Sequence, residues 1–454
     1  MSFRRCQLRI RVTFQRLILM AQRFYSTKSP GEFVDLKEAV LRSLPADNGL
    51  YMPEEIPVLG EEFWSQWRDW SFAELGYQVV RPLFKGAVPD EDLRKMVEEA
   101  INFDAPLVDL QNGRYVLELF HGPTLAFKDF GARFMARLMG WLTREDERDL
   151  TVLVATSGDT GGAVASAFHN VPGTRVVILY PSGKVSGLQE KQLTALGGNI
   201  TALEVDGTFD DCQRLVKAAF LKREMSEELN LTSANSINIS RLIPQSFYYF
   251  HAARQLPDGV KPVFVVPSGN FGNLTAGLLA AEMGLPVEHF VAATNINDVV
   301  PSYLKTGTYN PRASVGTISN AMDVGAPSNF VRMQHIFGDL WEQMRERIAG
   351  YANDDATTRK AIREIHSMTG YKMDPHGAVG WLAAEEWRTE HPDDATVILE
   401  TAHPAKFLDV MDEELGAGAV KIPERLGCLA DEEKVAIRMK PDEAEFLAWL
   451  GVQA

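Results

Sequence analysis

The chain has 454 residues, 45% of them hydrophobic, with three cysteines and a formal net charge of -15. A chain of this length and hydrophobic content folds as two or three domains with a large core. The negative charge argues against nucleic acid or an anionic membrane as a partner. The separated cysteines argue against a metal cluster or a disulfide framework, and no apolar run approaches the ~20 residues of a membrane span.

The first 23 residues are rich in arginine and contain no acidic residue. One interpretation is a mitochondrial or plastid presequence, because several apolar residues of this stretch would share one face of a helix. The other is that translation starts at Met20, which removes the arginine-rich stretch before it. We expect the cytoplasm on the second interpretation and an organelle on the first.

Residues 24–110 predict a small, mostly helical N-terminal domain, in which the Pro- and Gly-rich segment 48–60 separates two helical patterns. Beyond Tyr115, strands alternate with helices, which indicates mainly parallel sheet covered on both faces, with ligands at the carboxyl ends of the strands. The predicted strands are Val152–Ala155, Arg175–Tyr180, Ile200–Val205, Val263–Val266, Phe290–Thr294 and Thr396–Glu400. We assign a catalytic region of two subdomains to 111–425 and a C-terminal segment to 426–454.

Residues 120–134, FHGPTLAFKDFGARF, place Lys128 between Phe127 and Phe130, after a Gly-Pro turn. If this segment is buried, the loss of hydration favours the neutral amine, which can form an imine with an aldehyde cofactor. The same triplet also fits a surface helix whose lysine points into water. Two further segments favour the reactive lysine.

Two Gly-rich turns each follow a predicted strand and precede a predicted helix. They are Ser157–Gly162 and Ser268–Asn273, and neither has the dinucleotide or the Walker fingerprint. Such turns present backbone N–H groups and a helix N-terminus to an anion, although tight packing alone also accounts for their glycines. With Lys128 they indicate a cofactor that carries a phosphate and an aldehyde. Pyridoxal phosphate with an amino-acid substrate fits this description.

Six blocks of the chain resemble threonine synthase, a pyridoxal-phosphate enzyme family of the tryptophan-synthase-β group, also called fold type II. They are HGPTLAFKDFGARF, SGDTGGAVASAF, YPSGKVSGLQEKQL, NSINISRLIPQ, PSGNFGNLTAGLLA and ETAHPAKF. The start of the predicted N-terminal domain is similar to that of the bacterial and fungal form. The resemblance implies two parallel-sheet α/β domains plus a small N-terminal domain. It also implies conversion of O-phospho-L-homoserine and water to L-threonine and phosphate, by γ-elimination and β-hydration, as the final step of threonine biosynthesis.

The resemblance also implies roles for residues that contact the cofactor. Lys128 would form the imine and then transfer protons. Thr401, after the last predicted strand, would meet the pyridine nitrogen; its structural alternative is a hydroxyl that caps a turn. The cup for the cofactor phosphate would consist of Gly269, Asn270, Phe271, Gly272 and Asn273.

The substrate calls for two further anion sites. By resemblance, the turn at Ser157 to Thr160 binds the α-carboxylate, through backbone amides and the hydroxyl of Ser157 or Thr160. Asp159 stands where cysteine synthases and serine dehydratases usually carry Asn; because it would repel a carboxylate, we expect it to face the cofactor or a hydrogen-bonded neighbour. The substrate phosphate needs cations. The candidates are Arg133, Lys184 and Arg241, with Thr124, Ser236 and Asn238 as neutral hydrogen-bonding groups.

Several alternatives stay open. A serine/threonine dehydratase would share Lys128 and the phosphate cup, and an inactive relative would serve as a binding or regulatory protein. The sequence does not choose between a monomer and a homodimer. Nor does it decide whether Lys128 or the released phosphate is the base that adds water. No metal is expected, because the histidines are scattered and lack the H-E-x-x-H spacing.

Overall fold

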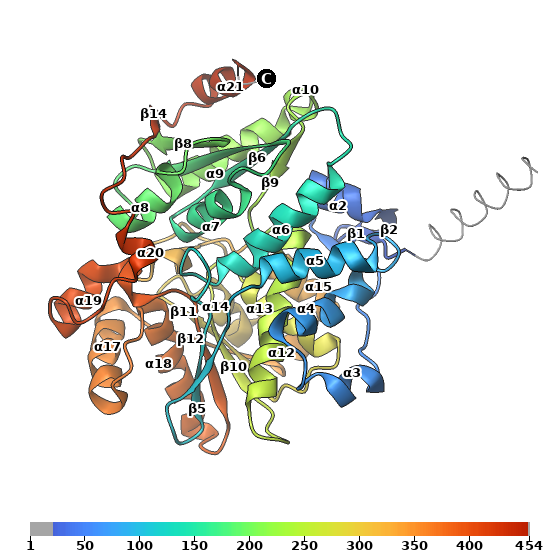
Figure 1. Cartoon of the computed structure of the whole chain (residues 1–454). Coiled ribbons are helices and arrows are strands. Elements are labelled where there is room, and N and C mark those ends of the chain that lie inside the picture. Colours follow the sequence, from blue (N-terminus) through green and yellow to red (C-terminus); the bar gives the residue numbers. More distant parts are fainter. Residues whose placement is uncertain (1–20, 453–454) are drawn as a thin grey trace, which may run out of the picture.

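The computed structural model describes residues 21–452, in which three sheets are surrounded by helices (Figure 1). The strand orders are β2-β1-β3, β12-β11-β10-β13-β5-β4 and β14-β8-β7-β6-β9. The two larger sheets are parallel apart from the edge strand β4, which runs antiparallel to β5. The architecture therefore has the two parallel-sheet α/β domains and the small N-terminal domain that the sequence predicts.

The N-terminal domain joins a short antiparallel sheet to a group of helices. Its elements are β1 (Phe24–Ser26), β2 (Ser29–Val34), α2 (Leu36–Arg42), β3 (Tyr51–Pro53), α3 (Glu61–Gln66), α4 (Phe72–Val80), η1 (Arg81–Phe84) and α5 (Asp90–Ala100). The helices confirm the predicted helical character, but the sheet was not predicted. Its strand β3 lies inside the segment that we expected only to separate helices. Of the arginine-rich stretch, residues 1–20 lie outside the described part of the chain, while Arg23 pairs with Glu54 at 2.5 Å.

The larger domain is built on the six-stranded sheet. Its strands are β4 (Leu107–Asp109), β5 (Arg114–Glu118), β10 (Val263–Pro267), β11 (His289–Thr294), β12 (Ile348–Ala352) and β13 (Thr396–Glu400). The helices α17 and α18 lie on one side of this sheet, and α12 and α13 on the other (Figure 1). All the helical elements of this domain, in chain order, are α11 (Ile239–Leu242), η2 (Ile243–Gln245), α12 (Ser246–Gln255), α13 (Gly272–Glu282), α14 (Val299–Thr306), η3 (Asn320–Met322), α15 (Phe330–Ile336), α16 (Trp341–Arg345), α17 (Asp355–Thr369), α18 (Pro375–Glu390), η4 (Pro404–Phe407), α19 (Leu408–Leu415) and α20 (Glu424–Gly427).

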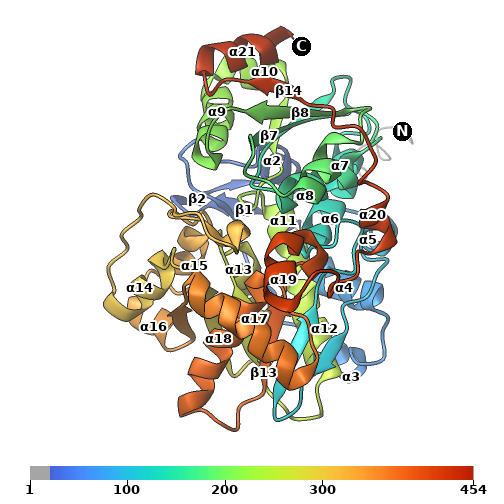
Figure 2. The ribbon, with the colours of Figure 1, turned by 90° about the vertical axis from the view of Figure 1, so that its left-hand side faces the viewer.

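The smaller domain is built on the five-stranded sheet, which lies above the larger one in Figure 2. Its strands are β6 (Leu150–Ala155), β7 (Thr174–Pro181), β8 (Ile200–Val205), β9 (Leu231–Ser233) and β14 (Ile437–Met439). Its helices are α6 (Lys128–Leu142), α7 (Asp159–Phe168), α8 (Gly187–Thr194), α9 (Phe209–Leu221), α10 (Arg223–Glu228) and α21 (Glu443–Val452). The strand β14 comes from the segment 426–454, which therefore completes the smaller domain. No helix of the described residues is long and apolar enough to cross a membrane.

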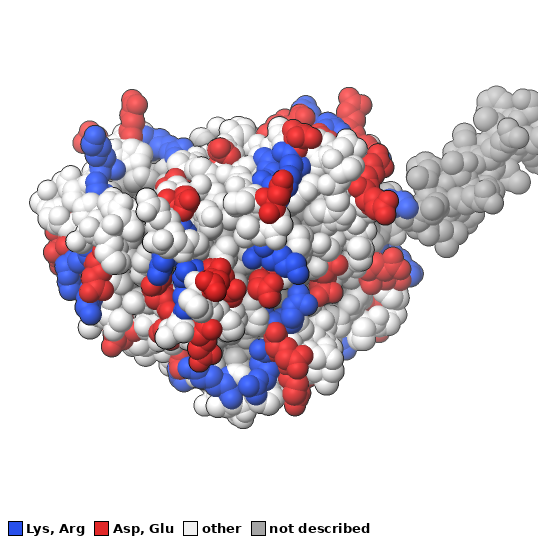
Figure 3. All heavy atoms as spheres, turned by 90° about the horizontal axis from the view of Figure 1, so that it is seen from below, with Lys and Arg blue, Asp and Glu red and all other residues white. Residues whose placement is uncertain are grey.

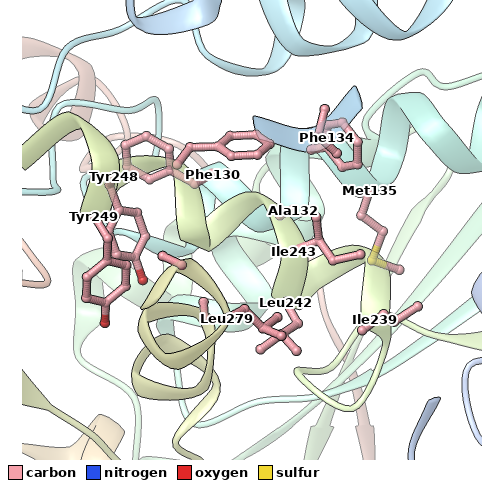
Figure 4. Close-up of a cluster of buried hydrophobic side chains, with 14 of the residues drawn as sticks. Phe130, Ala132, Phe134, Met135, Ile239, Leu242, Ile243, Tyr248, Tyr249 and Leu279 are labelled. Carbon is pink, nitrogen blue, oxygen red and sulfur yellow. The ribbon is translucent and has the colours of Figure 1, made fainter. Parts of the chain in front are cut away.

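The helix α6 is anchored by a core of aromatic and aliphatic side chains. Phe130, Phe134 and Met135 of α6 are fully buried and face residues of α11, η2 and α12 such as Ile243 and Tyr248 (Figure 4). The ring centroids of Phe130 and Tyr248 are 5.4 Å apart, in an edge-to-face arrangement. Burial of each such side chain contributes about 1.5–3 kcal/mol. This packing fixes the first residue of α6, Lys128, relative to both larger sheets.

Candidate active site

A pocket lies where the carboxyl ends of strands from the two larger sheets meet. Its lining includes Ala155 to Ser157 at the end of β6, Asn235 and Ser236 after β9, Pro267 and Gly269 to Asn273 at the end of β10, and Thr401 after β13. Its empty volume is about 770 Å³, open solvent at the mouth included. Lys128 also lines it. The pocket therefore lies where the predicted parallel sheets place their ligands.

Lys128 is held at the pocket by the segment before it. An isolated bridge joins Ala126 to Ala402, and the Phe127 N–H donates to the Thr401 carbonyl at 2.9 Å. The Lys128 side chain is 13% exposed. Burial lowers the pKa of Lys128 to about 8, against the opposing effect of Asp159. The amine is thus much closer to its reactive, neutral form at physiological pH than an exposed lysine would be.

The two phenylalanines beside Lys128 have different roles. The Phe127 ring lies 5.8 Å from the Lys128 Nζ, measured to its centroid. Phe130 instead points into the core, where it packs against Phe103 and Tyr248. The aromatic flank that we expected on both sides of the amine therefore exists on one side only, since Phe130 lies on the buried face of α6.

The second Gly-rich turn forms a concave loop at the N-terminus of α13. Phe271 has a φ of 58°, in the left-handed region, and precedes the first helical residue. The side chain of Asn273 closes the loop, since its Nδ2 donates to the Pro267 carbonyl at 2.8 Å and its Oδ1 accepts from the Ser268 hydroxyl at 2.9 Å. A Cβ on Gly269 would lie 2.6 Å from the Ala321 carbonyl oxygen. The loop is thus tightly packed and ends at the N-terminus of α13, where backbone N–H groups can bind a phosphate.

The first Gly-rich turn is organised by Thr156. Its hydroxyl oxygen accepts from the N–H groups of Gly158 and Gly161 at 3.0 and 2.8 Å. Ser157 and Thr160 line the pocket next to the N-terminus of α7. The turn therefore presents two hydroxyls and a helix N-terminus to the pocket, which suits a carboxylate.

Asp159 does not project freely into the pocket, because other side chains hold it. Its Oδ1 lies 2.6 Å from Lys406 Nζ and accepts from Gln189 Nε2 at 2.8 Å, while its Oδ2 lies 4.0 Å from Lys128 Nζ. Although burial acts to raise it, the pKa of Asp159 lies well below its usual range because Lys406 and Lys128 stabilise the carboxylate. This matches the hydrogen-bonded neighbour that we expected.

The structure brings one of the three candidate cations to the pocket. Arg241 of α11 lines it and is 3% exposed; its buried Nε has no hydrogen-bond partner among the described residues. Burial lowers the pKa of Arg241 to about 10. Lys184, in contrast, is exposed in the turn after β7, outside the pocket. Arg133 donates to the carbonyls of Glu99 and Ala100, because it lies about 140° around α6 from Lys128.

Two of the neutral candidates also lie elsewhere. Thr124 bonds the carboxylate of Asp129 through its N–H and its hydroxyl, at 2.8 and 2.7 Å. Asn238 caps α11 and donates to the Val40 carbonyl at 2.9 Å. Their polar groups are thus used within the fold, and neither residue lines the pocket. Ser236 does line it.

Sequence reasoning missed two functional candidates, His376 and Lys406. His376 lines the pocket; its Nδ1 lies 2.7 Å from Asp374, and its Nε2 accepts from the Ala321 N–H at 3.2 Å. This pairing places the imidazole proton on Nδ1. His376 directly follows Asp374-Pro375, and Lys406 lies within the ETAHPAKF block. Nothing in the sequence, however, shows which distant residues they contact.

The site fits pyridoxal phosphate. Lys128 supplies a desolvated amine for an aldehyde, and the loop 269–273 supplies backbone N–H groups at the N-terminus of α13 for a phosphate. Thr401 is 6% exposed and brings a hydroxyl to the same pocket. Arg241 leaves a buried donor for a further anion.

Comparisons with known proteins agree with this geometry. The family model of pyridoxal-phosphate dependent enzymes matches residues 102–401. Models of the threonine synthase N terminus and of the threonine synthase C-terminal region match residues 23–101 and 377–448. Threonine synthase from Escherichia coli (strain K12) is 44% identical over 412 residues, which cover 90% of this chain and 94% of that protein. The chain belongs to the threonine synthase family.

Solved structures of this family superpose on the chain along almost its whole length. The crystal structure of threonine synthase from Escherichia coli covers 95% of this chain and 99% of its own, with a TM-score of 0.89 and 42% identity. The PLP-bound threonine synthase from Brucella melitensis also covers 95% of this chain, with a TM-score of 0.87 and 34% identity. As a member of this pyridoxal-phosphate family, the chain uses pyridoxal phosphate as its cofactor.

Proposed function

We propose that the chain is a threonine synthase that converts O-phospho-L-homoserine and water to L-threonine and inorganic phosphate. Family similarity along nearly the whole chain supports threonine synthase activity in threonine biosynthesis. The observation that carries the substrate is Arg241, a buried guanidinium in the pocket of Lys128 with a donor that no described residue uses. Because Arg241 lines the pocket, a γ-phosphate on the substrate would accept from its guanidinium, whose Nη1 also donates to the Ala234 carbonyl.

Each anion of the reaction has a candidate site. The backbone amides of 269–273 and the N-terminus of α13 would hold the cofactor phosphate, and the Thr401 hydroxyl, which lines the same pocket, would meet the pyridine nitrogen. Ser157, Thr160 and the N-terminus of α7 bind the substrate carboxylate. Arg241 binds the substrate phosphate. A separate site for each anion lets the pocket orient the substrate before any bond breaks.

The proton transfers fall to Lys128. The bound cofactor would withdraw electrons from the substrate's α-carbon, which makes the proton on that carbon removable and then a proton on Cβ. Because burial lowers the pKa of Lys128 to about 8, its Nζ can take up such a proton and return it near neutral pH. The base that adds water at Cβ is either Lys128 or the released phosphate, which Arg241 would keep nearby.

A second cavity adjoins the pocket. It shares Ala155, Asn235, Ser236 and Asn270 with the pocket and lies between the N-terminal domain and the helices α9 and α10. Its lining also includes Arg42, Lys217 and Arg223, together with Glu227; Arg223 pairs with Glu227 and Arg42 with Glu38. We assign it as the entry route of the doubly anionic substrate, since cations along a channel raise the local concentration of an anion.

The assay for this proposal measures phosphate release and threonine formation from O-phosphohomoserine by the purified protein. A Lys128→Ala variant should lose at least a thousandfold in activity, because it removes the amine that holds the cofactor and transfers protons. After borohydride reduction of the wild-type holoenzyme, mass spectrometry should find the cofactor on Lys128. Formation of 2-oxobutanoate from threonine, without phosphate release, would favour the dehydratase instead.

The assembly and the cellular compartment stay predictions. We propose a small-molecule substrate, the cytoplasm as compartment and a monomer or homodimer as the assembly. On the face shown in Figure 3, acidic and basic side chains of the described residues are interspersed. The charge that selects an anionic substrate on this proposal therefore comes from inside the pocket and its entry, not from that face.

A further inference from the structure

A second lysine is buried beside Lys128. Lys406 lies in η4, directly after β13, and its side chain is 0% exposed. Its Nζ lies 2.6 Å from Asp159 Oδ1 and donates to the Thr124 carbonyl at 2.8 Å. A buried ammonium is costly unless it is paired, so this arrangement calls for an explanation.

The carboxylate of Asp159 stands between two ammonium groups at unequal distances. Lys406 and the amide of Gln189 both bond its Oδ1, whereas its Oδ2 faces Lys128 at 4.0 Å. A distance of 4.0 Å is too long for a hydrogen bond. Lys406 therefore takes the close ion pair, and Lys128 feels the same carboxylate only at a distance.

Other charged groups also act on this trio. Arg241 of α11 lowers the pKa of Lys128, while His376 of α18 lines the same pocket with its Nδ1 2.7 Å from Asp374. The neighbouring Asp129 is protonated more readily than usual, because burial raises its pKa. Lys406 and Asp159 are thus the closest pair of opposite charges around Lys128.

Without Lys406, the buried carboxylate of Asp159 would have Lys128 as its nearest ammonium group. A buried carboxylate favours the charged form of an adjacent amine. Lys128 would then be held as an ammonium ion, which can neither attack an aldehyde nor accept a proton.

We infer that Lys406 is a positioning residue that engages Asp159 and so prevents this carboxylate from capturing Lys128 in an ion pair. The inference rests on the proposed role of Lys128 as the residue that holds the cofactor. On this inference, Lys406 and Asp159 act as one functional unit. Asp159 is tolerated near the substrate carboxylate because the ammonium group of Lys406 balances its negative charge.

The test measures how fast pyridoxal phosphate attaches to apoenzyme as a function of pH. Only neutral Lys128 can condense with the aldehyde and release water, so the midpoint of the rate profile reports its proton affinity. In Lys406→Met the midpoint should rise by about one pH unit, which makes attachment about tenfold slower below the midpoint. In Asp159→Asn it should fall, because the anion that favours the ammonium is gone.

The double variant Asp159→Asn/Lys406→Met separates a charge effect from a folding defect. With both charges removed, the midpoint should return to within about 0.3 pH units of wild type, as a coupled pair requires. Lys406→Arg should keep a profile near wild type, since it restores the cation. As a control, Lys37→Met removes an exposed lysine that pairs with Asp146 and should leave the profile unchanged.

Two results would overturn the inference. One is an unchanged midpoint in Lys406→Met; the other is a shift in the same direction for both single variants. If Lys406→Met does not fold, the other two variants decide the matter. The midpoint should fall in Asp159→Asn and should not move in Lys37→Met. Failure of the proposed role of Lys128 would give a separate result. Mass spectrometry after borohydride reduction would then find the cofactor on a residue other than Lys128.

Discussion

Arg241 is the residue whose replacement should affect substrate selection most directly. In Arg241→Gln we expect the KM for O-phosphohomoserine to rise about tenfold to a hundredfold, because a charge-assisted hydrogen bond to phosphate contributes about 1.5–3 kcal/mol. Inhibition by inorganic phosphate should weaken in parallel. Steady-state kinetics with both ligands measure the two effects.

The matched control is Lys184→Gln, which removes an exposed lysine outside the pocket. Its KM should equal that of the wild type. A higher KM in Lys184→Gln, with an unchanged KM in Arg241→Gln, would transfer the phosphate site to the turn after β7.

At the scale of single residues, the sequence identifies those that carry a local pattern. Lys128 and the turn 269–273 are recognisable from their immediate neighbours, and the structure brings them into one pocket. Lys406 and His376 have no such pattern, because their partners lie far away along the chain. Arg133 does not reach the pocket for another reason. Its position on α6 sets the direction of its side chain, and a recognisable sequence block does not reveal that direction.

Among the structural elements, the turn before α13 is the most sensitive to a single added atom. In Gly269→Ala the new Cβ would lie 2.6 Å from the Ala321 carbonyl, so the η3 segment that covers the turn must move. Such overpacking costs about 1–3 kcal/mol, and we expect the affinity for pyridoxal phosphate to fall by about tenfold. Titration of apoenzyme with the cofactor, followed by absorbance, measures the change.

Gly60→Ala is the control for this substitution, because a Cβ on Gly60 would meet nothing within 4 Å. Its cofactor affinity should match that of the wild type. Equal affinities in the two variants would mean that the turn at Gly269 is not the cofactor's phosphate site.

The six predicted strands are all confirmed, each within two residues of its predicted bounds. The strand β8 has the bounds that we predicted, and β10 extends one residue further. The strands β9 and β14 have three residues each and were missed, since so short a segment carries almost no periodic signal. Missing β9 also concealed Asn235, which follows its carboxyl end and lines the pocket beside Ser236.

At the scale of the whole molecule, Arg332 connects segments from distant parts of the sequence. Its side chain is 0% exposed and donates to the carbonyls of Tyr51 in the N-terminal domain and of Ser236 and Ile237 beside the pocket. Despite these bonds, burial lowers the pKa of Arg332 to about 9. Arg332→Met would leave several buried carbonyls without a donor.

We expect Arg332→Met to lower the free energy of unfolding by about 3 kcal/mol. Calorimetry should show a melting temperature several degrees below that of the wild type. The exposed Arg345, which lies over the Trp341 ring, supplies the control Arg345→Met, with a melting temperature near that of the wild type. Equal melting temperatures in the two variants would show that the buried arginine is not a structural link.

The predicted division of the chain is simpler than the folded arrangement. The strand β4 lies within the range 24–110 of the predicted N-terminal domain, yet it pairs with β5 in the larger sheet. The segment 426–454 likewise joins the smaller sheet through β14. Pairing between strands that are remote in sequence depends on tertiary packing, which composition and periodicity do not encode.

The late position of β14 has a consequence for biosynthesis of the chain. During translation β8 is exposed as a sheet edge until residues 437–439 leave the ribosome, because β14 is its partner on that side. An uncovered edge strand readily pairs with another chain. A nascent or prematurely terminated polypeptide is therefore at risk of aggregation at β8, and molecular chaperones would have to shield that edge until β14 is made.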